Sequence, residues 1–205
     1  YNGCERFLAA WLPAQPFDMV LGSVHYIGGW CFDDPDERGR WETAGIEETW
    51  RAYFGLVARL ADSRMFDVLS HPDLPKKFGY RPTNRAVIEM AAPAMDRLAA
   101  AGMCIEINTG GLRKPVGEIY PDLFLLRLAR ERNIPICFGS DAHQPSEVGH
   151  EFQAAIRLAR EAGYSQYARF RARRRSMADL PQARNDCTEI PPAPPKHNPC
   201  SAHQC

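Results

Sequence analysis

The sequence predicts an α/β fold built on parallel strands, either an open sheet or a barrel. Short runs rich in apolar and β-branched residues alternate with longer segments whose apolar residues recur at helical spacing, and this alternation occurs four times. A helix that crosses over between two consecutive strands leaves those strands parallel. The length of 205 residues, with 45% hydrophobic residues, is sufficient for one ordinary domain or slightly more.

The predicted strands are apolar, β-prone runs, and most of them end in polar residues. They are expected at residues 17–25, 66–73, 103–110 and 134–143. Each strand is followed by a segment with helical periodicity. The predicted helices lie at residues 46–62, 83–102, 121–133 and 146–163. His150 falls within the last of these helical patterns, so we expect it to pack or to face solvent.

The second helix has the clearest end signals. Thr83 or Asn84 is expected as the N-cap residue, and Gly102 as the C-terminal stop. Pro93 lies inside this helical pattern. Because proline lacks an amide hydrogen and its ring collides with the preceding turn, we expect Pro93 to kink the helix or to split it.

Two further segments have distinctive compositions. The stretch GGWCFDDPDERGRW directly follows the first strand, and we expect it to form a wall of a functional pocket rather than only a connection. The stretch RFRARRR at residues 169–175 holds five arginines. Since the rest of the chain is close to neutral, we expect a solvated segment at the end of the domain rather than a nucleic-acid site.

The composition changes after Met177. Residues 178–205 contain six prolines and no aromatic residue, so they cannot build a core, and we expect a disordered tail. Two histidines and two cysteines of the tail have a spacing that fits no zinc module, namely His197, Cys200, His203 and Cys205. We therefore divide the chain into a folded domain at residues 1–177 and a Pro-rich tail at residues 178–205.

Charge and hydropathy exclude several classes of function. The 25 basic residues balance the 25 acidic ones, so no overall field draws the chain to nucleic acid or to an anionic membrane. No run of about eighteen consecutive apolar residues is present, and the N-terminal stretch lacks the features of a secretory signal. We therefore expect a cytoplasmic protein without nucleic-acid or membrane partners. Since the seven cysteines include no CxxC pair, we expect reduced thiols.

Polar side chains at the ends of the predicted strands are the candidate functional residues. They are His25 on the first strand, His71 and Asp73 on the second, Glu106 and Asn108 on the third, and Asp141 and His143 on the fourth. The carboxyl ends of parallel strands meet on one face, where active sites of α/β proteins lie. A single histidine in such a place is more often structural. Several together, with carboxylates, predict a site for Zn²⁺, Mn²⁺ or Fe²⁺.

Four stretches of the chain resemble the histidinol-phosphate phosphatases of the PHP (polymerase and histidinol phosphatase) superfamily. They are FDMVLGSVHYIGGWCFDDP, FDVLSHPDLPKKFGYRP, IEINTGGLRKPVGEIYP and NIPICFGSDAH, and the resemblance covers about residues 1–177. It implies a distorted (β/α)7 barrel whose cluster of metal ions hydrolyses L-histidinol phosphate in histidine biosynthesis. The metal ions would activate a bridging water that attacks phosphorus.

The resemblance also assigns roles to individual residues. His25 and His71 match metal-ligand histidines of the family, and Asp141 with His143 matches its final Asp-x-His motif. All four are expected as ligands of a multinuclear Zn, Mn or Fe site, and Asp141 and His143 also as catalytic residues. If the motif lies on a strand, the Asp-x-His spacing directs both side chains to the same face.

The chain differs from the family in its N-terminal part. PHP enzymes open with a His-x-His strand, and no His-x-His occurs among the six histidines of this sequence. With a β-α unit of about 30 residues, the part of the barrel without a counterpart is about 70–90 residues. We therefore expect the C-terminal portion of a PHP barrel. The alternative to an active phosphatase is an inactive or partner-dependent PHP fragment.

Basic residues after the second and third strands are candidates for binding the phosphate of a small-molecule ester. They are Lys76, Lys77, Arg113 and Lys114. The competing interpretation of each is an ordinary loop charge or ion pair. Glu106 and Asn108 alternate on the third strand and share one side, so one of them is expected to orient a metal ligand or to bind the imidazole or amine of the substrate.

Overall fold

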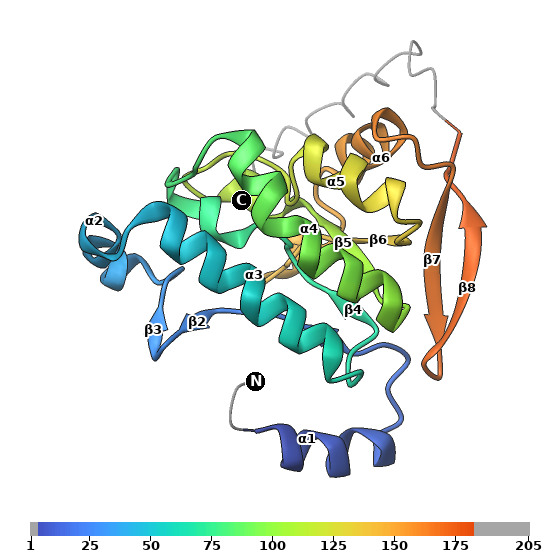
Figure 1. The fold of residues 1–205 in the computed structure, drawn as a ribbon. Coiled ribbons are helices and arrows are strands. Elements are labelled where there is room, and N and C mark those ends of the chain that lie inside the picture. Colours follow the sequence, from blue (N-terminus) through green and yellow to red (C-terminus); the bar gives the residue numbers. More distant parts are fainter. Residues whose placement is uncertain (1–3, 183–205) are drawn as a thin grey trace, which may run out of the picture.

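A four-stranded parallel sheet lies at the centre of the computed structural model, which describes residues 4–182 (Figure 1). The strand order is β1-β4-β5-β6, and every neighbouring pair is parallel. The bounds are Leu21–Gly22 for β1, Val68–Leu69 for β4, Cys104–Asn108 for β5 and Ile136–Gly139 for β6. The predicted α/β fold with parallel strands is confirmed. Within residues 4–182 the sheet is open, with β1 and β6 at its edges.

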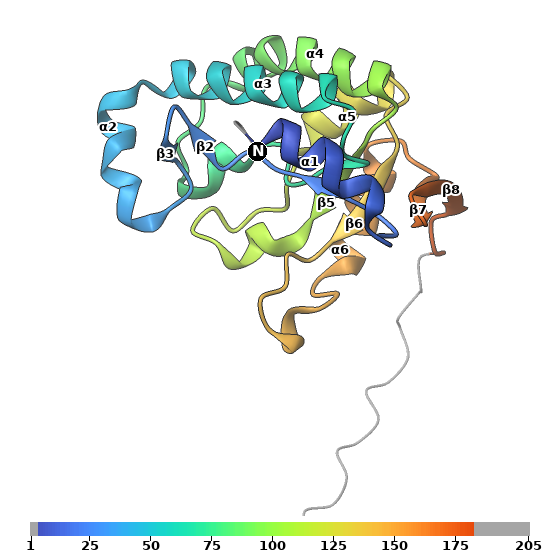
Figure 2. The ribbon, with the colours of Figure 1, turned by 90° about the horizontal axis from the view of Figure 1, so that it is seen from below.

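The crossover helices follow the strands in the predicted order. They are α3 (Ile46–Asp62), α4 (Asn84–Ala101), α5 (Leu123–Glu131) and α6 (Phe152–Glu161). Figure 2 shows α3 and α4 side by side along one face of the sheet. The bounds of α3 agree with the prediction to the residue. Its buried side chains include Trp50, Tyr53, Phe54, Val57 and Leu60, whose three- and four-residue spacing produced the helical pattern.

Shorter elements connect this framework. The helices are α1 (Glu5–Trp11) and α2 (Trp41–Ala44), and the 3-10 turns are η1 (Leu12–Ala14), η2 (Pro35–Arg40), η3 (Leu74–Phe78), η4 (Thr109–Arg113) and η5 (Pro145–Glu147). Helix α1 buries none of its side chains. Among the described residues, no helix has both the length and the apolar character needed to cross a membrane.

Helix α4 begins and ends where the sequence predicts. The Thr83 side chain accepts a hydrogen bond from the Ala86 amide, and Gly102 adopts a left-handed conformation with φ 69° at the C-terminus. Pro93 lies inside α4, which continues from residue 84 to residue 101. A split at Pro93 is therefore excluded. Buried residues on both sides, Met90 and Leu98 among them, hold the helix against the core despite the missing amide.

Two β-hairpins lie in segments for which the sequence predicted no strands. The first consists of β2 (Tyr26–Ile27) and β3 (Trp30–Cys31), and the second of β7 (Gln166–Arg171) and β8 (Arg174–Asp179). The arginine-rich stretch thus forms an ordered hairpin. Arg173 donates to both carboxylate oxygens of Asp67, at 2.9 and 3.0 Å, which ties the hairpin turn to the start of β4.

Three boundaries differ from the prediction. The strands are shorter, because the ladder between β1 and β4 contains only two residue pairs. His150 precedes α6 in an exposed turn instead of lying within a helix. Strand β8 ends at Asp179 and Leu180 is 8% exposed, so packed structure continues slightly past residue 177. The rest of the predicted tail, residues 183–205 with His197, Cys200, His203 and Cys205, lies outside the described residues.

Candidate active site at the strand ends

The ends of β1 and β4 bring His25 and His71 together, as predicted for parallel strands. The two imidazole rings meet edge to face, with centroids 5.1 Å apart. Strand β5 adds Glu106, whose carboxylate Oε2 accepts a hydrogen bond of 3.2 Å from the backbone amide of His71. Side chains from three strands therefore line one polar rim at the carboxyl end of the sheet.

His71 is held by its surroundings on several sides. Its backbone has φ 30°, in the left-handed region that non-glycine residues seldom adopt. Its carbonyl accepts from the Tyr53 hydroxyl at 3.3 Å, and its Nε2 lies 3.3 Å from Ser70 Oγ. Burial, followed by the nearby charge of His25, lowers the pKa of His71 to about 4. The imidazole is therefore neutral at ordinary pH.

Several buried polar atoms lack a hydrogen-bond partner among the described residues, and two of them belong to neighbouring rings. They are His71 Nδ1 and the hydroxyl oxygen of Tyr120. The two rings are neighbours, with centroids 6.3 Å apart. Folded proteins rarely leave such atoms unpaired. This unpaired nitrogen on a neutral imidazole is the feature of the site that is most suited to a bound group.

His25 is oriented by a carboxylate that sequence reasoning did not single out. Its Nδ1 lies 3.0 Å from Asp33 Oδ1. The ammonium group of Lys77 lies 3.2 Å from the other carboxylate oxygen of Asp33 and also donates to the Asp33 carbonyl. Burial by itself raises the pKa of Asp33, but the hydrogen bond and charge of His25 and the Lys77 ammonium outweigh burial and lower this pKa to about 2. Asp33 is therefore a carboxylate at ordinary pH.

Glu106 and Asn108 share one side of β5, as predicted. Asn108 Nδ2 donates to Glu106 Oε2 at 2.8 Å, and Asn108 Oδ1 accepts from the Gly110 amide at 2.8 Å. Burial raises the pKa of Glu106. The Glu106 side chain packs against Gly139 of β6, where an added Cβ would collide with the carboxylate. Both polar side chains are thus engaged in holding the strand ends and the His71 backbone.

The Asp141–His143 motif is arranged differently from the prediction. Strand β6 ends at Gly139, and Asp141 has φ 49°, so the chain turns before the motif is complete. The alternation of side chains along a strand therefore does not apply. His143 is exposed, and its Nδ1 lies 2.9 Å from the Asp141 carbonyl within the same turn. The structure does not bring His143 into contact with the His25–His71 pair.

The predicted phosphate-binding cations fall into different environments. Arg113 donates to the carbonyls of Ser140 and Asp141, at 2.7 and 3.1 Å, and so fixes the turn after β6. Lys77 is paired with Asp33. Lys114 is half-buried and has no ion pair with any side chain that the structure describes. Two of the four cations keep capacity for a ligand among the described residues, namely Lys114 and Arg113, whose buried Nη1 has no hydrogen-bond partner there.

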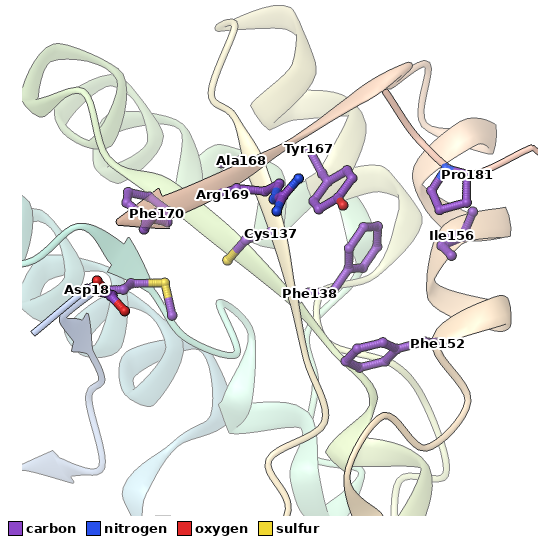
Figure 3. Close-up of a pocket in the computed structure, with 11 residues that line it drawn as sticks. Asp18, Cys137, Phe138, Phe152, Ile156, Tyr167, Ala168, Arg169, Phe170 and Pro181 are labelled. Atoms are coloured by element: carbon purple, nitrogen blue, oxygen red, sulfur yellow. The ribbon is translucent and has the colours of Figure 1, made fainter. Parts of the chain in front are cut away.

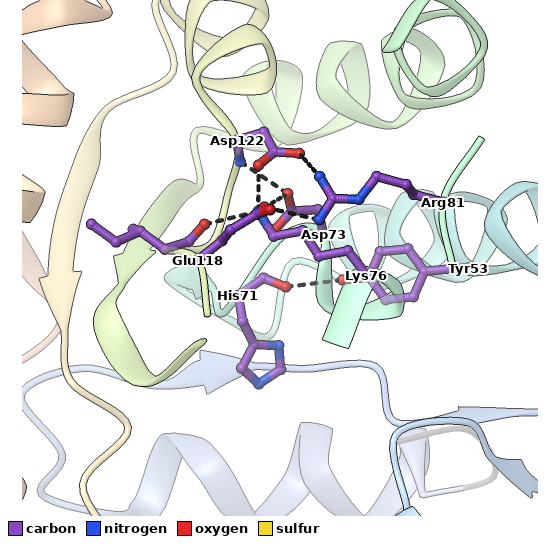
Figure 4. A network of polar contacts seen from close by, with 8 residues as sticks. Tyr53, His71, Asp73, Lys76, Arg81, Glu118 and Asp122 are labelled. Carbon is purple, nitrogen blue, oxygen red and sulfur yellow. Dashed lines mark hydrogen bonds and ion pairs between the residues drawn. The ribbon is translucent and has the colours of Figure 1, made fainter. Parts of the chain in front are cut away.

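Lys76 is an internal residue rather than a phosphate contact (Figure 4). Its side chain is fully buried, and its ammonium group lies 2.6 Å from Asp122 Oδ1, 2.9 Å from Asp73 Oδ2 and 2.8 Å from the Ile119 carbonyl. Burial alone would lower the pKa of Lys76, but the charges of Asp73 and Asp122 raise it, so the group stays protonated. Lys76 is therefore not available to a substrate.

The ligands expected for a metal cluster do not all assemble. Nowhere within residues 4–182 do three His, Cys, Asp or Glu side chains gather closely enough to hold a metal ion. His25 and His71 fit two ligand positions, since they are adjacent and His71 Nδ1 is unpaired. The described residues could therefore supply two imidazole ligands to a metal ion, but they do not bring a third donor close enough to complete a site.

An apolar pocket lies away from this polar rim. It has a volume of about 420 Å³ and lies between β6, α6 and β7 (Figure 3). Its lining includes Phe138, Phe152, Tyr167 and Phe170 and the thiol-bearing Cys137. None of the candidate site residues lines it. The polar rim and this apolar pocket are thus separate features.

Comparison with known proteins connects the chain to one group of enzymes. Residues 125–161 match a protein-family model described as PHP-associated. A probable histidinol-phosphatase of Deinococcus radiodurans is 42% identical over 163 residues, which is 80% of this chain and 62% of that protein. The histidinol-phosphatase of Bacillus subtilis is 46% identical over 56 residues, 27% of this chain and 21% of that protein. The chain thus spans less than two thirds of the length of both relatives.

Solved structures share the fold. A histidinol phosphate phosphatase of Lactococcus lactis, in complex with zinc, L-histidinol and phosphate, has a TM-score of 0.68 at 20% identity, covering 86% of this chain and 68% of that one. A putative histidinol phosphatase of Listeria monocytogenes has a TM-score of 0.67 at 23% identity, covering 75% of this chain and 64% of that one. These findings confirm the resemblance that the four sequence stretches indicated.

Proposed function

The chain is a partial-length relative of the histidinol-phosphatases, and from this relationship we propose that it serves to hydrolyse L-histidinol phosphate to L-histidinol and phosphate. The observation that carries the proposal is the pair formed by His25 and His71. The family resemblance assigned both as ligands, and the strand ends bring their rings to 5.1 Å. Such a phosphatase would act in histidine biosynthesis, and we propose the cytoplasm as its place.

We propose that His25 and His71 contribute nitrogen ligands to a divalent cation, with Asp141 and His143 as further ligands and as catalytic residues. Zn²⁺, Mn²⁺ and Fe²⁺ all accept this mixture of imidazole and carboxylate. The neutral imidazole and unpaired Nδ1 of His71 support the proposal. A multinuclear site requires more donors than residues 4–182 bring together. When bound, the cations would polarise the phosphoryl oxygens and the attacking water.

The other residues of the rim are proposed to bind and to orient. Lys114 is proposed to contact the substrate phosphate, since no described side chain neutralises it. Arg113 acts through the Asp141 turn, which its guanidinium group holds by two carbonyl oxygens. Glu106 and Asn108 act through the His71 backbone, to which Glu106 is bonded. These roles fix the strand ends before a substrate arrives.

One observation favours a second candidate, a chain that requires a partner for catalysis. It is the lack of three gathered ligand side chains within residues 4–182. In this case the residues of the rim would bind metal weakly or not at all until another polypeptide supplies the remaining donors. The two candidates make opposite predictions for the purified chain.

The test is metal content and phosphatase activity of the 205-residue chain with histidinol phosphate, after addition of Zn²⁺ or Mn²⁺. His71→Ala and Asp141→Ala are the variants, and His150→Ala, at an exposed turn, is the matched control. Activity that is lost in both variants and kept in the control supports the proposed function. A folded chain that binds no metal and releases no phosphate supports the partner-dependent candidate.

A further inference from the structure

The hairpin after β1 returns the chain to His25. Gly28 and Gly29 have φ values of 56° and 83°, so this two-residue connection uses the left-handed conformations that glycine adopts readily. In the resulting ladder Tyr26 pairs with Cys31, and the Phe32 amide donates to the His25 carbonyl at 3.2 Å. The next residue, Asp33, is thereby placed beside the His25 ring.

The contact between His25 and Asp33 is partly buried, with the His25 side chain 40% exposed, and a third side chain supports it. His25 Nδ1 lies 3.0 Å from Asp33 Oδ1, and the Asp33 side chain is 14% exposed. The Lys77 ammonium lies 3.2 Å from Asp33 Oδ2, and the Lys77 side chain is 13% exposed. Lys77 belongs to η3, which follows the strand end that carries His71. A carboxylate bound on its other oxygen by an ammonium group cannot easily rotate away from the imidazole.

We infer that Asp33, held in place by Lys77, is a positioning residue that fixes the proton of neutral His25 on Nδ1. A carboxylate can only accept a hydrogen bond, so the nitrogen facing it must carry the hydrogen. Nε2 is then the nitrogen with a free electron pair, ready for a Lewis acid or a hydrogen-bond donor. This inference rests on the proposed function in one respect, that His25 has a ligand to receive.

The test is nitrogen-15 NMR of the full chain labelled on histidine, with chelator present and at about pH 8.5, where imidazoles are neutral. Long-range nitrogen–proton correlations distinguish the two tautomers directly. The signals of His25 are assigned by their loss in His25→Gln. The expected result for the unmodified chain is a pure Nδ1–H pattern at His25. A mixture of tautomers, or a pure Nε2–H pattern, overturns the inference.

Variants then test Asp33 and Lys77 separately. Asp33→Asn can donate from its amide, so we expect the His25 signals to shift toward the Nε2–H pattern, whereas Asp33→Glu keeps an acceptor and retains Nδ1–H. Lys77→Met should give a partial shift that Lys77→Arg prevents. The matched control is Asp34→Asn, since Asp34 accepts from the Asp36 amide and asparagine caps equally well. An unshifted Asp33→Asn spectrum overturns the inference.

Phosphatase assays on the same set separate this inference from the proposed function. We expect Asp33→Asn to lower kcat/KM by about 10- to 100-fold and Asp34→Asn to leave it unchanged. If the unmodified chain releases no phosphate but shows the Nδ1–H pattern, the proposed function fails and the positioning role of Asp33 stands. If Asp33→Asn does not fold, the tautomer of His25 in the unmodified chain alone decides whether the inference holds.

Discussion

Lys76 Nζ lies 2.9 Å from Asp73 Oδ2, and both side chains are completely shielded from solvent. Asp122, 2.6 Å from the same ammonium group, completes a network that joins the turn after β4 to the segment before α5. Asp73 Oδ2 also accepts from the Asp122 amide at 2.9 Å. The network includes Glu118, whose carboxylate binds Arg81 at 2.9 Å. Two loops of the candidate site are therefore fixed to each other by charge.

Lys76→Met should destabilise the fold strongly. The substitution removes the cation and leaves the fully buried Asp73 beside the half-buried Asp122. Removing one partner of a buried ion pair costs about 3–5 kcal/mol. Urea unfolding at neutral pH measures the change. Arg85→Met is the control, because Arg85 and Glu89 form an exposed pair within one helix. Equal losses in the two variants would contradict the structural role of Lys76.

Gly139→Ala should disturb the site through Glu106. An alanine Cβ at this position collides with the Glu106 carboxylate, which must then move away from the His71 amide. We expect a loss of about 1–3 kcal/mol in the free energy of unfolding. Gly55→Ala in α3 is the control, since nothing lies within 4 Å of its added Cβ and alanine favours a helix. The idea fails if both variants are as stable as the unmodified chain.

Acid should weaken the fold through His71. Its folded pKa of about 4 lies below the unfolded value of 6.5, so between these values the unfolded chain binds a proton that the folded chain does not. The stability that His71 contributes is complete above about pH 6.5 and is lost progressively as the pH falls toward about 4. Between about pH 7.5 and about pH 4.5, the Tm of the unmodified chain should therefore decrease more than the Tm of His71→Gln. Parallel Tm curves would disprove this, and exposed His150→Gln should follow the unmodified chain.

Arg113→Met should loosen the turn that carries Asp141. The guanidinium group bonds the carbonyls of Ser140 and Asp141, and methionine offers no donor. We expect faster amide hydrogen exchange in residues 140–150, with α3 unchanged, as measured by mass spectrometry. Lys114→Met is the control, since Lys114 has no ion pair with the described residues around it. Unchanged exchange in Arg113→Met would exclude this role.

The sequence was sufficient to predict the features that follow from apolar periodicity and from the direction of the strands. Apolar spacing defined α3 to the residue, because one face of that helix is buried along its whole length. The pairing of His25 with His71 followed from the convergence of parallel strand ends. The alternation of side chains along a strand correctly placed Glu106 and Asn108 on one side of β5.

Features that depend on turns could not be predicted from periodicity and strand direction. The contact of Asp33 with His25 depends on the hairpin at Gly28 and Gly29, and the Gly-Gly pair was the signal that could have revealed it. His143 was placed by strand alternation, which fails because the chain turns at Asp141. For Lys76 the sequence left phosphate binding and an ion pair both open, because the carboxylate partner Asp122 is 46 residues away in the sequence.

The 46-residue separation between Lys76 and Asp122 also affects the order in which the chain folds. His71 takes its place in a turn whose charges are neutralised by a segment that follows β5, so the turn cannot be locked when β4 alone has formed. The chain must first close a loop that includes all of α4 and β5, and long loops of this kind are slow to close. We therefore expect the candidate site to be completed together with the sheet, because local structure around His71 does not include Asp122.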